Sequence, residues 1–144
     1  MGLFNIFNVS GSGMSAQSVR LNTTASNIAN ADSVSSSIDK TYRARHPVFE
    51  AELAKANDMQ AGGGHSGQGQ SVKVAGIVES DKPLIKEFSP DHPMADSDGY
   101  IYKPNVNVME EMADMISASR AYQMNVQVAD ATKSMLQQTL RMGK

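Results

Sequence analysis

Metal binding is the first chemistry that the residue types allow, because the chain has three histidines and several acidic residues. His46, His65 and His92 could in principle bind a metal together with Asp91 or Asp96. Two of the histidines precede a proline, the third lies among glycines, and none forms a close pair. Structural or solvated histidines are therefore the favoured interpretation, and we predict no metal site.

Calcium, phosphate and nucleophilic chemistry receive even less support. The segment DSDG (96–99) is similar to part of a calcium loop, but Met94 stands where the longer pattern needs an aspartate, so a turn is predicted. The glycines of AGGGHSGQGQ (61–70) lack the strand-to-helix context of a phosphate cradle and predict a mobile loop. With no Cys and no recognisable Ser, His and acid arrangement, we predict neither enzyme activity nor a cofactor.

Composition and charge exclude further classes of function. The 144 residues are 6% aromatic, so they supply little of the bulk that usually dominates a core. A formal net charge of −2 with interspersed signs predicts no binding to nucleic acid and no polybasic membrane anchor. The N-terminus lacks the basic and apolar regions of a secretory signal, so we expect that any export proceeds without a cleaved signal peptide.

A helix is predicted near the N-terminus, within residues 1–31. Steps of four and three residues there produce a repeat of the coiled-coil type, but half of its positions are polar or small. The repeat is Leu3, Phe7, Ser10, Met14, Gln17, Leu21, Thr24, Ile28 and Ala31. Gly11 and Gly13 lower helix propensity, so we expect the continuous helix to begin near Ser12.

The C-terminal zone, residues 105–144, predicts one long helix. Asn107 with Glu110 is a plausible N-terminal cap, and Gly143 a plausible stop. Residues 107–142 would span roughly 54 Å at the α-helical rise, more than the width of a small domain. The predicted seam is Val108, Met112, Met115, Ser119, Tyr122, Val126, Ala129, Lys133, Leu136 and Leu140. Off this seam lie further apolar residues, which are Met109, Ile116, Met124, Met135 and Met142. They predict that more than one side of the helix packs against other elements or subunits.

Between the helices, residues 32–104 predict a small β-rich middle domain. Short strands are expected at 42–49, 72–75, 84–88 and 100–102. Residues 80–83 could close a hairpin between the second and third strands, and Asp98-Gly99 could form a turn before the fourth. The predicted fold is mainly α with this β-rich insert, its two long helices pairing as a coiled-coil-like hairpin.

Several long segments resemble one protein family. SGMSAQSVRLNTTASNIANADS (12–33) is similar to the N-terminal signature of bacterial flagellar rod and hook proteins. TYRARHPVF (41–49), VKVAGIVE (72–79), KSML (133–136) and the whole of 89–126 resemble the proximal-rod members of that family. The segments DSVSSSID (32–39) and 61–70 depart from the family pattern.

The resemblance implies a non-enzymatic, self-assembling subunit of the flagellar rod, which crosses the periplasm and transmits torque. It implies export through the flagellar type III apparatus, with copies of the chain and other rod subunits as partners and no membrane insertion. It also implies that the helix pair, about 12–31 with 107–142, lines the inner tube while the middle domain lies outside.

We expect the subunit-packing residues to lie on both helices, where short side chains allow close approach and polar groups bond across subunits. They are Met14, Leu21, Ala25, Asn27, Ile28, Asn30, Val108, Met112, Met115, Tyr122, Val126, Ala129, Leu136 and Leu140.

Three other interpretations stay open. The helices could pair only within one monomer. The chain could be another type III-exported axial or translocator-like helical protein, although the continuous apolar face or basic flanks that membrane insertion requires are missing. It could also be a soluble binding module such as an export chaperone, which should be well folded in isolation.

Overall fold

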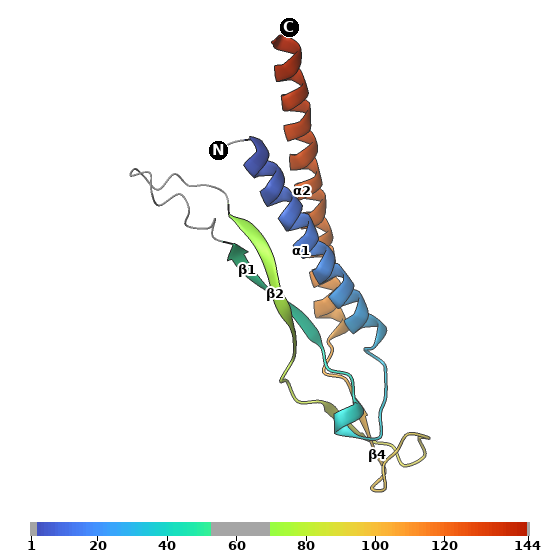
Figure 1. Ribbon diagram of the computed structural model, residues 1–144. Coiled ribbons are helices and arrows are strands. Elements are labelled where there is room, and N and C mark those ends of the chain that lie inside the picture. Colours follow the sequence, from blue (N-terminus) through green and yellow to red (C-terminus); the bar gives the residue numbers. More distant parts are fainter. Residues whose placement is uncertain (1–2, 53–69, 144) are drawn as a thin grey trace, which may run out of the picture.

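Two long helices and two small sheets make up the chain in a computed structural model that describes residues 3–52 and 70–143 (Figure 1). The predicted glycine-rich loop lies outside the described residues except for Gln70, as does the side chain of Leu3. The elements in chain order are α1 (Leu3–Ala29), the 3-10 helix η1 (Ile38–Lys40), β1 (Arg45–Glu52), β2 (Ser71–Glu79), β3 (Ile85–Phe88), β4 (Tyr100–Lys103) and α2 (Val108–Met142). The prediction of two long terminal helices around a small β region is confirmed.

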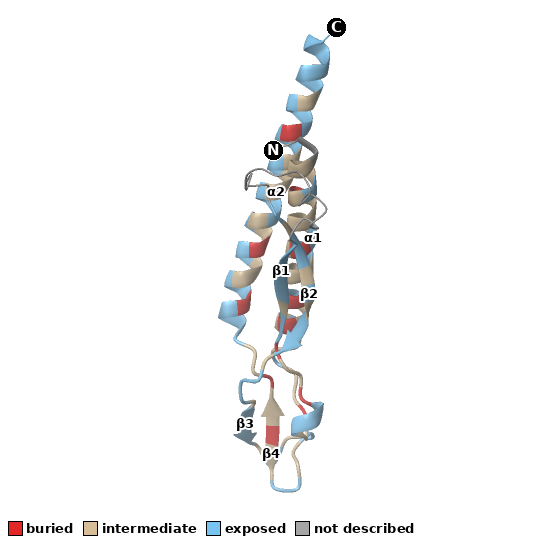
Figure 2. Cartoon of the chain, turned by 60° about the vertical axis from the view of Figure 1, so that its left-hand side comes forward, coloured by how far each residue is buried: buried red, intermediate tan, exposed pale blue. Residues whose placement is uncertain are grey.

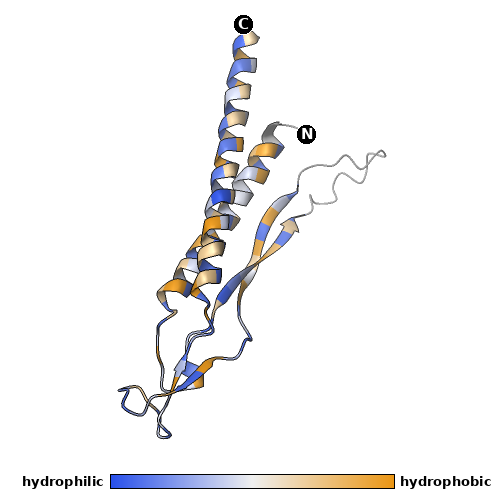
Figure 3. Ribbon diagram, turned by 180° about the vertical axis from the view of Figure 1, so that it is seen from behind, coloured by the Kyte–Doolittle hydropathy of each residue, from blue (hydrophilic) through white to orange (hydrophobic). Residues whose placement is uncertain are grey.

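Helices α1 and α2 run antiparallel and side by side (Figures 1 and 3). Asn27 of α1 bonds to Glu111 of α2, and Gly13 of α1 lies against Asn125 of α2. The two contacts are the same number of residues apart on both helices, so the helices stay in one register between them. By the same count Leu3, where α1 begins, falls opposite residue 135. The last turns of α2 therefore project beyond α1, as Figure 1 shows.

The expected start of α1 near Ser12 is wrong, because the helix continues back to Leu3 through Gly11 and Gly13. A Cβ atom at Gly13 would lie 2.8 Å from Nδ2 and 3.1 Å from Cγ of Asn125. Glycine at this position therefore allows α2 to approach closely. The packing of the two helices outweighs the low intrinsic helix propensity of glycine.

Both ends of α2 agree with their sequence signals. The side chain of Asn107 accepts a hydrogen bond from the Met109 amide at 3.1 Å, which satisfies one of the free donors of the first turn. Glu110 and Glu111 lie in that turn, where their negative charge interacts favourably with the positive end of the helix dipole. The helix ends at Met142, and Gly143 follows it as the C-cap.

The predicted hairpin at 80–83 is wrong. β1 pairs antiparallel with β2, from Arg45 opposite Glu79 to Glu52 opposite Ser71, with a bulge at Val48 and Phe49. β3 instead pairs antiparallel with β4. The Asn105 side chain donates to the carbonyls of Ser80 and Lys82, which holds the segment between β2 and β3 as an extended link rather than a tight turn.

The predicted turn before β4 is confirmed. Gly99 adopts a φ of 79°, a conformation in which a side chain is strained. The Asp96 carboxylate accepts hydrogen bonds from the amides of Asp98 and Tyr100, both at 2.9 Å. These bonds lower the pKa of Asp96 from its ordinary value of 3.8, the Tyr100 amide being the largest cause.

The β1–β2 ribbon lies against α1, which also packs on α2 (Figures 1 and 2). Asn27 bonds to the backbone of Arg45 at the start of β1, whereas the Ser12 hydroxyl accepts from the Val72 amide of β2 at 3.1 Å. The two strands cross in Figure 1. The twist of the ribbon therefore brings β1 against α1 near Asn27 and β2 against α1 near Ser12.

Few apolar side chains are fully enclosed. The buried apolar residues in the described part of the chain are Ala16, Ala44, Ile101 and Ala118, together with Pro104. The buried polar residues are Ser10, Thr23, Thr24, Asn27, Ser35, Thr41, Glu111 and Thr132. Figure 2 shows the buried residues as short, separated bands on the two helices, on β4 and on the segments that connect the elements, rather than as one continuous core.

Candidate functional site

Asn27 lies at a polar junction between three segments of the chain. It is 0% exposed, and its amide nitrogen donates to the Arg45 carbonyl at 2.8 Å and to Oε1 of Glu111 at 2.9 Å. Its oxygen accepts from the Arg45 amide and from the Tyr42 hydroxyl, both at 2.9 Å. An asparagine amide has two donors and two acceptor positions, so every one of them is used within the chain.

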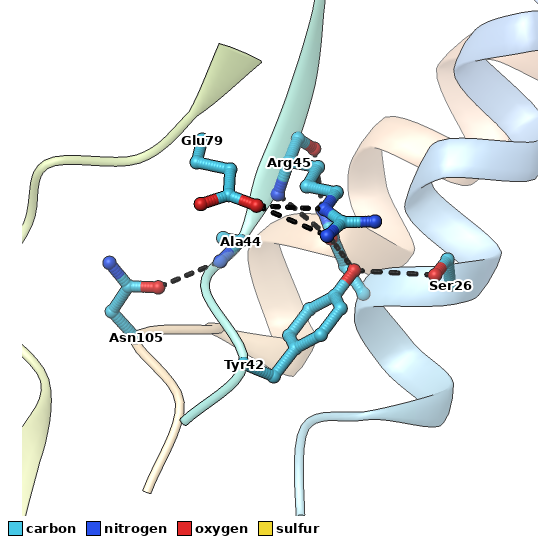
Figure 4. A network of polar contacts seen from close by, with 7 residues as sticks. Ser26, Tyr42, Ala44, Arg45, Glu79 and Asn105 are labelled. Atoms are coloured by element: carbon cyan, nitrogen blue, oxygen red, sulfur yellow. Dashed lines mark hydrogen bonds and ion pairs between the residues drawn. The ribbon is translucent and has the colours of Figure 1, made fainter. Parts of the chain in front are cut away.

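The neighbours of this junction form a wider network, which Figure 4 shows from close by. The Tyr42 hydroxyl also lies 3.3 Å from Oγ of Ser26, and the Arg45 guanidinium lies 5.5 Å from the centre of the Tyr42 ring. Arg45 pairs with Glu79 across the β1–β2 ribbon at 3.1 Å, in an exposed position where an ion pair contributes little stability. The network therefore continues from α1 through β1 to β2.

Glu111 is the junction's contribution from α2. The residue is 4% exposed, and one of its carboxylate oxygens accepts the bond from Asn27. The other oxygen is buried and has no hydrogen-bond partner in the described chain. A buried carboxylate with a single partner depends strongly on that partner, because losing it would leave both oxygens unsatisfied.

Apolar side chains gather instead on the outside of α2. Ile116 and Met124 are 54% and 64% exposed, and with Ala113, Ser117, Arg120 and Ala121 they line an open groove of about 470 Å³. These residues recur every three or four positions, so they form one face of the helix. We name this set, residues 113, 116, 117, 120, 121 and 124, the outer face of α2. The groove is mostly apolar, although Ser117 and Arg120 also line it, and an exposed apolar groove of this kind is a candidate interaction surface.

The residues predicted on α1 divide between several environments. Met14, Leu21, Ile28 and Asn30 are half-buried, and Ala25 is exposed. Asn27 is buried, and its amide makes four hydrogen bonds within the chain, whereas the sequence alone predicts bonds across subunits.

The residues predicted on α2 lie at the edge of its contact with α1. Met115, Val126, Ala129 and Leu136 are half-buried, whereas Val108, Met112, Tyr122 and Leu140 are exposed. The positions that the chain itself buries, Glu111, Ala118 and Thr132, each come one residue before a predicted seam position. The contact with α1 therefore uses a neighbouring line of small and polar residues, and much of the predicted apolar seam stays open.

The junction partners of Asn27 were not predicted from the sequence. The sequence predicts Tyr42 and Arg45 as part of a strand and assigns no role to Glu111. The one available signal was the seven-residue spacing of Glu111, Ala118, Asn125 and Thr132, but these small and polar residues produce no hydrophobic periodicity.

Residues 3–52 and 70–143 contain neither a cluster of potential metal ligands nor a helix long and apolar enough to cross a membrane. No group of three or more His, Asp or Glu side chains there could hold a metal ion, and His65 lies outside these residues. Neither α1 nor α2 contains an apolar stretch that could cross a membrane.

Comparisons with known proteins find flagellar basal-body rod proteins that are similar along the whole chain. A family model described as "Flagella basal body rod protein" matches residues 7–35, and one described as "Flagellar basal body rod FlgEFG protein C-terminal" matches residues 97–142. The flagellar basal-body rod proteins FlgC of Salmonella typhimurium and of Escherichia coli O6:H1 are each 45% identical over 144 residues, 100% of both chains. The FlgC of Bacillus subtilis is 35% identical over 152 residues, again covering 100% of both chains.

Proposed function

Because the chain belongs to the FlgC family of flagellar basal-body rod proteins, we propose that it builds the rod by burying the outer face of α2 against neighbouring subunits. The chain is a structural subunit of the flagellar basal-body rod. Its assembly partners, in this proposal, are copies of itself and other rod subunits.

One observation carries this proposal, namely that the large apolar side chains of α2 point outward. Ten of them are exposed, including Met109 at 76%, Met124 at 64% and Leu140 at 67%, while the contact with α1 uses alanine and polar residues. Burying apolar area contributes about 25 cal/mol per Å², so association gains what the monomer leaves exposed. Methionine adapts its shape to unlike neighbours, which suits a subunit that meets several.

The finer parts of the proposal come from the family. We place the chain in the proximal rod and propose that it reaches the periplasm through the flagellar type III apparatus without a cleaved signal peptide. The lack of cysteine supports this route, since the chain folds alike in reducing and oxidising compartments. The helix pair would line the inner tube, with the β ribbons outside it.

We also propose that α1 and α2 interdigitate as in a coiled coil. The seven-residue spacing of the buried Glu111, Ala118 and Thr132 supports this arrangement, because heptad spacing keeps one line of residues against a partner helix. The subunit-packing role then falls to the half-buried and exposed apolar residues of the predicted set, such as Met14, Leu21, Met112 and Leu140.

The test replaces the apolar outer face while leaving the monomer intact. In a host whose own gene is deleted, the double variant Ile116→Glu/Met124→Glu should be exported but should not enter basal bodies, so cells should not swim. The control Gln123→Glu/Gln127→Glu adds the same charge at exposed polar positions of α2 and should restore swimming. Export, incorporation and motility are measured separately.

Normal incorporation of the Ile116→Glu/Met124→Glu chain would contradict the proposal. Flotation of the purified parent chain with liposomes would instead favour the translocator-like alternative.

A further inference from the structure

The four hydrogen bonds of Asn27 join α1, α2 and β1 at one enclosed point. Two of them bind the amide and the carbonyl of Arg45, as the peptide group of a neighbouring strand would. The third reaches Glu111 near the start of α2, and the fourth comes from Tyr42, just before β1. One side chain therefore positions two other elements relative to α1.

We propose that Asn27 sets the register of α1 against both α2 and β1, with Glu111 as its positioning partner on α2. A buried polar residue in a helix seam specifies register because any other alignment leaves it unsatisfied. A shift of α1 by seven residues would place Ala118 opposite Asn27 and would leave Glu111 without its donor.

One other polar contact between the helices also depends on register, namely the ion pair of Arg20 with Asp114, whose Nη2 and Oδ1 atoms lie 2.6 Å apart. Both side chains are partly exposed to solvent, where an ion pair contributes little.

The other contacts between the helices discriminate poorly between registers. Gly13, Ala16 and Ala118 are small, and the buried Ser10 and Thr132 have side chains of only two and three heavy atoms. A shift would disturb the close fit of Asn125 against Gly13, but the rest of this surface consists of small residues and opposes sliding only weakly. The inference concerns the fold of a single chain and does not depend on how the chain assembles.

The test changes hydrogen-bond direction without changing shape. Asn27→Asp replaces the amide nitrogen with an oxygen that faces the Arg45 carbonyl and the Glu111 carboxylate. Adding Glu111→Gln to the same chain supplies a new donor toward residue 27. Asn22→Asp, which puts the same charge at an exposed position of α1, is the matched control.

Engineered cysteine pairs in the full chain measure the register, because the natural chain has no cysteine. Gly13→Cys with Asn125→Cys reports the observed register, since a Cβ at Gly13 lies 3.1 Å from Cγ of Asn125. Gly13→Cys with Ala118→Cys or with Thr132→Cys reports a shift by one heptad in either direction. Disulfide yields after mild oxidation are compared among the three pairs.

In the parent and in Asn22→Asp, the 13–125 disulfide should exceed each shifted disulfide by about tenfold or more, the ratio that one or two hydrogen bonds produce. Asn27→Asp should reduce this preference to about threefold or less, and Glu111→Gln in the same chain should restore part of it.

Three results would overturn the proposal as a whole, and a fourth would overturn the part assigned to Glu111. A parent chain without preference for 13–125, or an Asn27→Asp chain that keeps the full preference, would each do so. An Asn27→Asp chain that loses helical circular dichroism without gaining a shifted disulfide would show that Asn27 contributes stability rather than register. Failure of Glu111→Gln to restore any preference would remove Glu111 from the proposed pair.

Discussion

At the residue scale, Asp96 shows how one side chain shapes a turn. Its carboxylate accepts the amides of Tyr100 and Asp98, and the charge of Lys86 and the Tyr102 hydroxyl also favour its ionised form. A carboxyl whose pKa is lowered on folding stabilises the fold above its unfolded pKa, and this contribution is lost as the pH falls through the folded value. The loss therefore sets in as the pH approaches 3.8 and continues as the pH falls through the lower folded pKa.

We expect the pKa of Asp96, followed by the carboxyl chemical shift in NMR, to be lower in the folded chain than in the same chain unfolded by urea. The Tyr100 and Asp98 amides should lose protection from hydrogen exchange over the same acidic range. A folded pKa equal to or above the unfolded one would show that the turn does not favour the charged carboxylate.

The two glycines of α1 provide a second prediction at this scale. No heavy atom lies within 4 Å of a Cβ built at Gly11, whereas one built at Gly13 meets Asn125 at 2.8 Å. Gly11→Ala should raise the free energy of unfolding by about 0.5 to 1 kcal/mol, the usual difference in helix propensity. Gly13→Ala should lose this gain or destabilise the chain, because Asn125 has to move.

Urea unfolding of both variants at low protein concentration measures the difference. Equal stabilisation by the two substitutions would show that α1 and α2 do not approach as closely as described.

At the scale of the element, neighbouring residues of α2 lie on faces of the helix that differ in burial. Val126 is half-buried and Gln127 is exposed. Val126→Glu should be exported yet fail to build rod, because enclosing an unpaired carboxylate costs several kcal/mol. Gln127→Glu adds the same charge about 100° around the helix, where substitutions usually change stability by less than about 0.5 kcal/mol.

Secreted protein, incorporated protein and swimming are scored for each variant. If Val126→Glu assembles and swims like the parent, then Val126 is not enclosed by α1 or by a neighbouring subunit in the rod.

Sequence alone predicts an element well when its signals are local. The ends of α2 follow from Asn107 and Gly143, and the turn before β4 follows from Asp98-Gly99. The start of α1 was missed because Gly13 is explained only by Asn125, a residue far along the chain. The hairpin at 80–83 was mispredicted for the same reason, since Asn105 holds that segment extended.

The junction around Asn27 lay beyond prediction for a related reason. Its four bonds come from residues separated from it by up to 84 positions, and no spacing rule connects them. The seam of α2 was predicted from apolar periodicity, but the chain pairs its helices through small and polar residues. Periodicity finds apolar faces and does not say whether the partner is the same chain or another.

At the scale of the whole molecule, the projecting end of α2 is the most exposed part of the helix pair. Residues 136–142 extend past the start of α1, and Leu140 and Met142 are 67% and 82% exposed. Removal of residues 137–144 should leave the unfolding midpoint near that of the parent, because residues 137–143 are exposed and make few contacts within the chain. Incorporation into basal bodies should fall strongly, because the projecting turns are available only to neighbours.

Thermal unfolding followed by circular dichroism and immunoblots of purified basal bodies separate these effects. Leu140→Gln should reproduce the assembly defect, and Gln138→Ala should not. Full incorporation of the shortened chain would show that the projecting turns bind no neighbour.

The antiparallel pairing also decides where a reporter group can be attached. The first turn of α1 and the last turn of α2 lie at the same end of the molecule, and the turn between β3 and β4 lies at the opposite end (Figure 1). A fluorescent protein fused to either terminus would thus lie at the end of the molecule where α2 projects and is available to neighbours. A short epitope or a single dye inserted near Asp91, which is exposed in that far turn, would leave both helices untouched and let the subunit be followed in living cells.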